Sequence, residues 1–189
     1  MRPIDKNMKI LNIIFFTATI LWMSVIFIFS SQTGDTSSDF SGGITEKIVK
    51  IIYNDFTSFS PDKQLNILES TNYIIRKGAH FTEYAILGAF TALTLFTYIC
   101  KDISRYKRYT IKNFFIKNIV CSTIISSLYA VSDEIHQGFT EDRNPSIYDV
   151  CLDSSGSLFA ILIISLIFYI FHIKKCSSSN TINAKEAKP

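Results

Sequence analysis

The sequence lacks paired cysteines. Its four cysteines, Cys100, Cys121, Cys151 and Cys176, are far apart and form no C-x-x-C pair. Disulfide frameworks and cysteine zinc sites need cysteines at close and regular spacing. The sequence therefore predicts neither, and we expect the four thiols to fill apolar or interfacial positions.

A strong excess of charge of one sign is also absent. The formal net charge is +3, and the lysines and arginines gather in patches beside apolar runs. This pattern is typical of proteins at a membrane surface rather than of proteins that bind nucleic acid. We expect a membrane partner and no nucleic acid, while the oligomeric state is left open.

The sequence does contain apolar runs long enough to cross a bilayer. They cover about 10–30, 79–100, 114–137 and 149–172, and about 20 helical residues span roughly 30 Å of hydrocarbon. The first run is longer than a signal-peptide core and ends without a small-x-small cleavage site, which predicts a retained anchor. We therefore predict an all-α membrane protein, a four-transmembrane-helix bundle in a single domain, 1–173. The Ser- and Lys-rich tail, 174–189, is expected to be disordered and cytoplasmic.

The connector 32–77 is expected to contain amphipathic helices. Isoleucines recur at helical spacing from Ile44 to Ile52, opposite lysines and a glutamate, and Leu65, Leu68 and Ile75 predict a second helix after Pro61. Such faces are typical of helices that lie on lipid headgroups or pack over a bundle. Fewer than 50 residues make a small core, so we favour surface helices over a separate globular domain.

The distribution of basic residues predicts the orientation. Residues 101–117 contain six lysines and arginines, whereas the connection between the third and fourth runs contains only Arg143. By the positive-inside rule, both termini and the basic loop are cytoplasmic, and the other two connectors are extracytoplasmic.

Polar residues of all four runs are predicted to lie at one depth. The intervals Lys9–Ser30, His80–Lys101, Lys112–Asp133 and Asp153–Lys174 are each 21 residues long. At 1.5 Å per residue each is about 31 Å, one hydrocarbon thickness. We therefore expect these polar groups to meet at the outer interface.

The residues at this depth form the candidate site. Histidine with carboxylates is the composition of general acid–base catalysis, so the candidate catalytic residues are His80, Glu83, Asp133, Glu134 and His136. Candidate substrate-binding residues are Arg143, Lys77, Gln137, Asp149 and Asp153. The pairs His80-x-x-Glu83 and Asp133-x-x-His136 also have spacing suited to metal ligands, but neither is specific and no metal site is predicted.

Structural roles explain some of these residues equally well. Asn144-Pro145 is typical of an N-cap followed by the first helical residue, and Ser146-x-x-Asp149 fits a capping box. Asp149 alone is therefore better explained as a cap. Because the connection is short and flanked by acids, we also expect Arg143 to contact Asp133, Glu134, Asp149 or Asp153.

Several motifs together resemble the VanZ-like family of bacterial membrane proteins. They are Phe29-Ser30-Ser31-Gln32, Lys77-x-x-His80-x-x-x-Tyr84-x-x-Leu87, Ser132-Asp133-Glu134-x-x-Gln137-x-Phe139, Arg143-x-x-Ser146-x-x-Asp149-Val150 and Asp153-x-x-Gly156. Members often have Asn at the position of Asp153, and Pro-Gly where this chain has Glu141-Asp142. The family is named for a protein associated with resistance to teicoplanin, a lipoglycopeptide that acts at the outer membrane face. The resemblance implies a role in the cell envelope but no reaction.

Three functions remain open from the sequence. The first is an enzyme that modifies a membrane lipid or a lipid-linked envelope precursor at the outer face, with phosphate bound by Arg143, Arg76 and Lys77. The second is a non-catalytic protein that binds a lipid or drug and alters access to the surface. The third, a small transporter, is disfavoured because the runs lack the Gly/Pro-broken pairs of midplane substrate sites. No cofactor is indicated.

Overall fold

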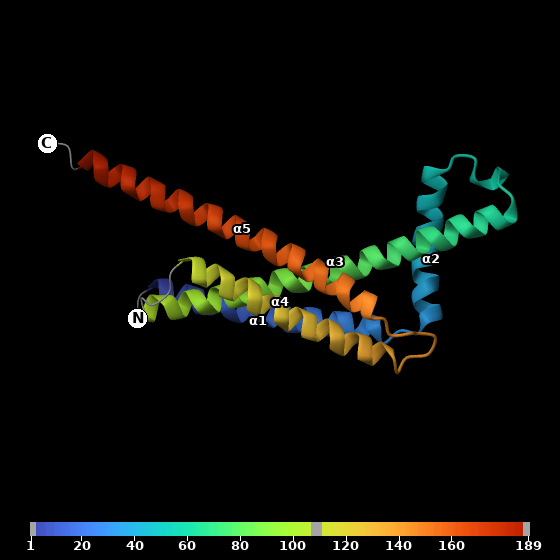
Figure 1. Ribbon diagram of the computed structural model, residues 1–189, viewed down its shortest axis with the longest axis horizontal. Coiled ribbons are helices and arrows are strands. Elements are labelled where there is room, and N and C mark those ends of the chain that lie inside the picture. Colours follow the sequence, from blue (N-terminus) through green and yellow to red (C-terminus); the bar gives the residue numbers. More distant parts are fainter. Residues whose placement is uncertain (1–2, 107–110, 187–189) are drawn as a thin grey trace.

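The computed structural model describes residues 3–106 and 111–186, and these ranges contain helices and loops but no strand. The order of elements is α1 (Pro3–Ser30), α2 (Gly34–Ile52), the short 3-10 helix η1 (Phe56–Ser58), α3 (Pro61–Tyr106), α4 (Ile111–Gln137) and α5 (Ile147–Glu186). Four long helices run along one another, while α2 crosses their direction at one end (Figure 1). The predicted all-α architecture is confirmed.

Four helical segments are long and apolar enough to cross a membrane: Lys6–Ser30, Pro61–Ile99, Asn113–Gln137 and Ile147–Phe171. Large apolar side chains such as Ile13, Leu21, Leu166 and Phe171 are exposed on the outside of these helices. In water such a surface would drive association, whereas in a bilayer it faces hydrocarbon. The chain is a multi-pass membrane protein.

Helix α3 is the centre of the bundle, because it packs against α1, α2, α4 and α5. The buried core lies around it and joins Ile26, Tyr84, Leu87 and Ala130 from three helices. Trp22 of α1 donates a 2.8 Å hydrogen bond to the backbone carbonyl of Glu83 in α3. This bond fixes the register of α1 against the turn of α3 that contains the candidate site.

Two glycines allow α3 and α5 to approach closely. A Cβ atom on Gly156 would lie 2.3 Å from the carbonyl oxygen of Phe81, and one on Gly88 would lie 2.4 Å from that of Ser157. Ser157 also donates a 2.9 Å hydrogen bond to the carbonyl of Tyr84. Small residues of this kind are typical of contacts between membrane helices. They bring Asp153, one turn before Ser157, against the centre of the bundle.

The predicted second connector helix and the predicted second span form one helix rather than two. Helix α3 contains 46 residues, which is about 69 Å of α-helix. No proline interrupts the chain between residues 61 and 106, and a single glycine such as Gly78 costs a helix only about 1 kcal/mol. The amphipathic and apolar segments therefore join without a break, and α3 extends past the bundle (Figure 1).

The expected first connector helix is present as α2, and it packs over the end of the bundle. Its N-cap Thr33 accepts a hydrogen bond from the backbone N–H of Thr36. Arg76 of α3 donates to the Oγ atom of Ser38 at 3.2 Å, and the N–H of Gly34 donates to the carbonyl of Glu141 at 3.1 Å. Helix α2 is thus held between α3 and the α4–α5 connection.

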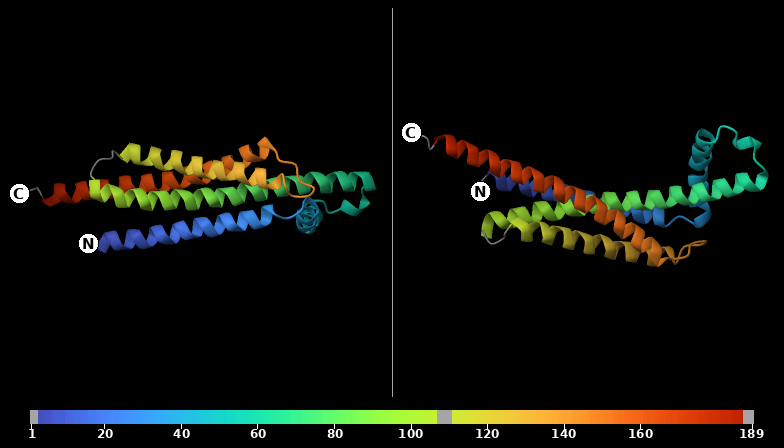
Figure 2. Two further views of the ribbon diagram at one scale, coloured as in Figure 1. Left: turned by 90° about the horizontal axis from the view of Figure 1, so that it is seen from below. Right: turned by 45° about the horizontal axis from the view of Figure 1, so that its top comes forward.

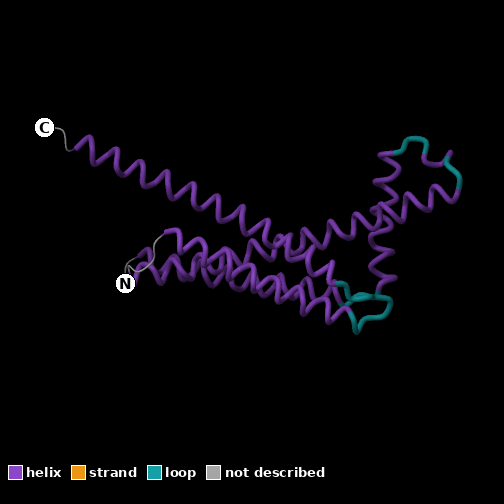
Figure 3. The backbone as a smooth tube through the Cα atoms, viewed as in Figure 1, coloured by secondary structure: helices purple, strands orange, loops and turns teal. Residues whose placement is uncertain are grey.

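The two chain ends lie at one end of the bundle, and α2 and the α4–α5 connection lie at the other (Figure 2). The loops at that second end are short (Figure 3). Helix α5 runs to Glu186 and so includes most of the tail for which the sequence predicts disorder; that disorder stays a prediction. Residues 107–110 of the expected basic loop lie outside the described residues.

Candidate functional site

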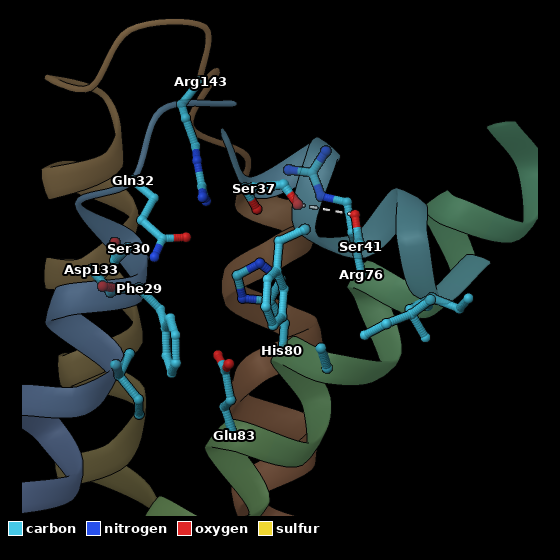
Figure 4. A pocket seen from close by; sticks show the side chains of 15 residues that line it. Phe29, Ser30, Gln32, Ser37, Ser41, Arg76, His80, Glu83, Asp133 and Arg143 are labelled. Carbon is cyan, nitrogen blue, oxygen red and sulfur yellow. Dashed lines mark hydrogen bonds between the residues drawn. The ribbon is translucent and has the colours of Figure 1, made fainter. Parts of the chain in front are cut away.

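A pocket of about 160 Å³ lies where α2 crosses the bundle. Figure 4 shows side chains from several elements pointing into it. Its polar lining includes Ser30 of α1, Ser37 of α2, Arg76, His80 and Glu83 of α3, Asp133 of α4, and Arg143 of the α4–α5 connection. Its apolar lining includes Ile26, Phe29, Phe40, Ile44 and Ile75. The pocket is therefore amphipathic, because charged and hydrocarbon side chains both line it.

A second pocket of about 160 Å³ lies beside the first and is more polar. Arg76, His80 and Arg143 line both pockets. The second pocket is completed by Lys77, Gln137, Asp142, Asn144 and Asp149, together with Tyr73. These three shared side chains therefore form the boundary between the two pockets.

Arg143 reaches the acids through a glutamine rather than directly. Its Nη1 atom donates to the Oε1 atom of Gln137 at 3.0 Å, and Nε2 of Gln137 donates to Oδ2 of Asp133 at 3.1 Å. The expected contact between Arg143 and an acid is therefore wrong in its direct form. Gln137 follows Asp133 by one helical turn, so its amide fills the space between the two charges.

Two arginines meet at the pocket without ion-pair partners. Neither Arg76 nor Arg143 forms an ion pair with any residue that the structure describes, and the Nε atom of Arg143 is buried without a hydrogen-bond partner. Burial, and next the charge of Arg76, lower the pKa of Arg143 from its ordinary value, while the carboxylates of Asp133, Glu134 and Glu83 oppose this shift. The pair presents unmatched positive charge at the pocket.

Asp133 of α4 lines the same pocket and is 4% exposed. Its Oδ2 atom accepts from Gln137, but its Oδ1 atom has no partner within the described structure. The hydroxyl of Ser30, a residue 3% exposed, likewise lacks a partner. Buried polar atoms are nearly always hydrogen-bonded in folded proteins. These two atoms are therefore prime candidates to contact a ligand.

Asp153 lines neither pocket, although it interacts electrostatically with Asp133. It is fully buried, and both of its carboxylate oxygens, like the Tyr84 hydroxyl, lack a partner among the described groups. Tyr84 interacts electrostatically with both aspartates. Asp153 lines neither pocket, so its role in direct substrate contact stays a prediction.

Glu134 is directed away from the pocket, toward the start of α5. Its Oε2 atom accepts a 2.8 Å hydrogen bond from the backbone N–H of Ser146. The Oγ atom of Ser146 in turn accepts from the N–H of Tyr148. Ser146, rather than Asn144, is therefore the N-cap, and α5 begins at Ile147.

Asp149 forms an ion pair with Lys77 instead of completing a capping box. The backbone N–H that a capping box would give to Asp149 is already bound by Glu134. The Lys77–Asp149 pair joins α3 to the first turn of α5 and forms part of the wall of the second pocket.

His136 contacts α1 rather than the other site residues. Its ring stacks on Phe27 with centroids 4.4 Å apart, and its Nε2 atom lies 3.0 Å from Oγ of Ser31. This resembles a nucleophile–base pair, but the Ser31 hydroxyl donates to the carbonyl of Phe27 at 2.7 Å. Since that proton is engaged, the ring nitrogen is the donor to Ser31, and the pair has a structural role.

The site is suited to binding an anion and to acid–base chemistry on it. His80 and Glu83 lie on one side of the pocket, below the guanidinium of Arg143 (Figure 4). Histidine and glutamate are the usual general acids and bases. The described residues contain no group of three or more His, Cys, Asp or Glu side chains suited to a metal ion.

The apolar wall of the pocket is not predicted from the sequence. Phe29, Phe40 and Ile44 come from α1 and α2, and helical periodicity marks α2 as amphipathic without showing which helix it covers. The motif Phe29-Ser30-Ser31-Gln32 was a usable signal, because Phe29, Ser30 and Gln32 all line the pocket.

Neither the curated proteins nor the solved structures give a match to this chain. A family model described as VanZ/LLP1 matches residues 15–169. The match includes most of α1, the whole of α2, α3 and α4, and the part of α5 that contains Asp153 and Gly156. It therefore contains every residue that lines the two pockets, and the chain belongs to the VanZ/LLP1 family.

Proposed function

We propose that this protein binds the phosphate-bearing headgroup of a membrane lipid, or of a lipid-linked envelope precursor, in the pocket beneath α2. The observation that carries the proposal is the unpaired couple of Arg76 and Arg143. Arginine binds phosphate through two parallel hydrogen bonds, and a phosphate between two guanidinium groups would remove their mutual repulsion.

The apolar wall supports a lipid rather than a free anion. Phe29, Phe40 and Ile44 line the pocket and are also exposed on the outside of α1 and α2. A hydrocarbon chain attached to the bound phosphate would therefore meet apolar side chains on its way to the bilayer.

The size of the pocket favours a headgroup over an antibiotic. Its volume of about 160 Å³ is below the roughly 300–1,000 Å³ of sites for drug-sized ligands. A lipoglycopeptide is larger still. We therefore attribute any link to teicoplanin resistance to an altered envelope lipid rather than to drug held in this pocket.

The proposed location is the outer face of a bacterial plasma membrane, with both termini cytoplasmic. Lys6 and Lys9 lie in the first turns of α1, and α1 begins at the end of the bundle opposite α2 (Figure 2), which lines the pocket. The positive-inside rule then assigns the pocket to the extracytoplasmic side.

Binding can be measured through Trp22, the one tryptophan of the chain, which contacts the carbonyl of Glu83. Purified protein in a nonionic detergent is titrated with phosphatidic acid and with diacylglycerol of the same chains, while tryptophan emission is recorded. We expect saturable binding of phosphatidic acid only. Arg143→Gln and Arg76→Gln should each weaken it about tenfold or more, because a hydrogen bond to a charged group contributes about 1.5–3 kcal/mol.

Lys47→Gln is the matched control, since Lys47 is exposed on α2 and lines neither pocket. It should bind phosphatidic acid as the wild type does. Equal binding of diacylglycerol, or normal binding by both arginine variants, would contradict the proposal.

A further inference from the structure

The charges of the pocket are separated along its depth. Arg143 enters from the α4–α5 connection at the top of the view, Arg76 lies near it, and Glu83 points upward from the bottom (Figure 4). Asp133 and Ser30 lie across the pocket from His80. A ligand that fills the pocket would therefore meet the two arginines at the top of the view, Glu83 at the bottom, and Asp133 and Ser30 at the side (Figure 4). We call Glu83, Asp133 and Ser30 the acidic end of the pocket.

The acidic end offers three oxygen acceptors to one small group. Oδ1 of Asp133 and Oγ of Ser30 are buried without a partner, and the half-buried carboxylate of Glu83 lines the same pocket. The three groups come from α4, α1 and α3 and thus converge only in the folded bundle. A primary ammonium has three N–H donors and no acceptor, so it matches this set in number and charge.

Among the described residues, neither Asp133 nor Glu83 forms a direct ion pair with a cation. Asp153, which is fully buried, adds a second acidic side chain that interacts with Asp133, and the hydrogen bonds of Arg143 reach Asp133 only through the neutral amide of Gln137. Buried carboxylates without a counter-charge are unfavourable in an apolar bundle. A bound ammonium would supply the counter-charge at the atom, Oδ1 of Asp133, that has no hydrogen bond.

We infer that the headgroup bound in this pocket is zwitterionic: a phosphate ester that also has a primary amine, as in ethanolamine phosphate. Its phosphate lies between Arg76 and Arg143, and its ammonium lies among Asp133, Glu83 and Ser30. This inference rests on the proposed function, because it assigns the other end of the same ligand. It adds a selectivity that phosphate binding alone does not produce.

The test compares three lipids with identical chains in the tryptophan titration. Phosphatidylethanolamine has the phosphate and the amine, phosphatidic acid lacks the amine, and phosphatidylcholine has a quaternary nitrogen without N–H donors. We expect phosphatidylethanolamine to bind at least about tenfold more tightly than either of the others, a ratio that corresponds to about 1.4 kcal/mol. Soluble O-phosphoethanolamine is then added as a competitor. If it displaces the lipid, the headgroup is sufficient for binding; if it does not, binding requires the intact lipid.

Two variants assign the selectivity to the acidic end. Asp133→Asn and Glu83→Gln should each bind phosphatidylethanolamine and phosphatidic acid with nearly equal affinity, so that the ratio of the two affinities is close to one. Asp39→Asn is the control, because Asp39 is exposed on α2 and lines neither pocket, and it should keep the wild-type ratio. Because Glu83 is only half-buried, Glu83→Gln gives a result even if the Asp133 variant does not fold.

The outcomes separate this inference from the proposed function. Phosphatidic acid bound as tightly as phosphatidylethanolamine would overturn the amine assignment and leave phosphate binding standing. A wild-type ratio in folded Glu83→Gln and Asp133→Asn would also overturn it. If neither lipid binds, both proposals are wrong.

Discussion

The backbone N–H of Ser146 donates a 2.8 Å hydrogen bond to Oε2 of Glu134, so a carboxylate at the end of α4 caps the start of α5. A buried glutamate in a cluster of acids is easily taken for a catalytic residue. Here its hydrogen bond fixes the angle at which the chain leaves α4 and re-enters the bundle. It also leaves Asp149 free to pair with Lys77.

Replacing Glu134 should therefore affect folding more than ligand binding. Glu134→Gln keeps an oxygen acceptor for the Ser146 N–H and should be tolerated. Glu134→Ala should lower the free energy of unfolding by about 1–2 kcal/mol, the usual effect of losing a helix cap. Thermal unfolding in detergent measures the effect of each variant on folding. Phosphatidic acid binding per folded molecule measures its effect on ligand binding. If folded Glu134→Gln lost phosphatidic acid binding, Glu134 would have a role in ligand binding.

Asp142 should be replaceable by glycine but not by a β-branched residue. It has a φ of 59°, in the left-handed region that favours Gly and tolerates Asp and Asn. This is the position at which VanZ-like proteins often have the Gly of a Pro-Gly pair. Asp142→Gly should be neutral or slightly stabilising, whereas Asp142→Val should destabilise by about 1–2 kcal/mol. Unfolding temperatures of the two variants test this, and equal values would contradict it.

The depth of the site could be predicted from the sequence, but not the direction of each side chain. Counting one hydrocarbon thickness from the basic anchors identified Ser30, His80 and Asp133, which line one pocket. Asp133 and His136 are both candidate catalytic residues from the sequence, and they are three residues apart. At 100° per residue that spacing leaves a difference of about 60°. In a helix with neighbours on two sides this difference directs Asp133 to the pocket and His136 to Phe27 of α1.

The partners of the charged side chains could not be predicted from the sequence either. Opposite charges at a short connection favour direct pairing, yet Gln137 lies between Arg143 and Asp133. Which of several acids accepts a given donor depends on distances of a few tenths of an ångström. Such distances follow from how α3 and α5 pack, and helical periodicity does not contain them.

Gly156 and Gly43 should respond to alanine in opposite ways. A Cβ on Gly156 would lie 2.3 Å from a backbone oxygen of α3, whereas one on Gly43 would have nothing within 4 Å. Gly156→Ala must move a helix and should destabilise by about 1–3 kcal/mol. Gly43→Ala should stabilise α2 by up to about 1 kcal/mol, because alanine is the better helix former. Unfolding temperatures of the purified variants measure both, and a stabilised Gly156→Ala would show that α3 and α5 do not pack as described.

Cysteine labelling should show the pocket end of the bundle on the outside of the cell. In a background with all four cysteines replaced by serine, we would introduce Phe139→Cys or Arg105→Cys and treat intact cells with a membrane-impermeant maleimide. Phe139 lies in the α4–α5 connection and is 85% exposed, so its cysteine should react at once. Arg105 lies near the end of α3, in the basic segment that the positive-inside rule assigns to the cytoplasm. Its cysteine should react only after the membrane is permeabilised. The reverse pattern would put the pocket at the inner face, where the same lipid phosphates occur, and would exclude a role at the outer surface.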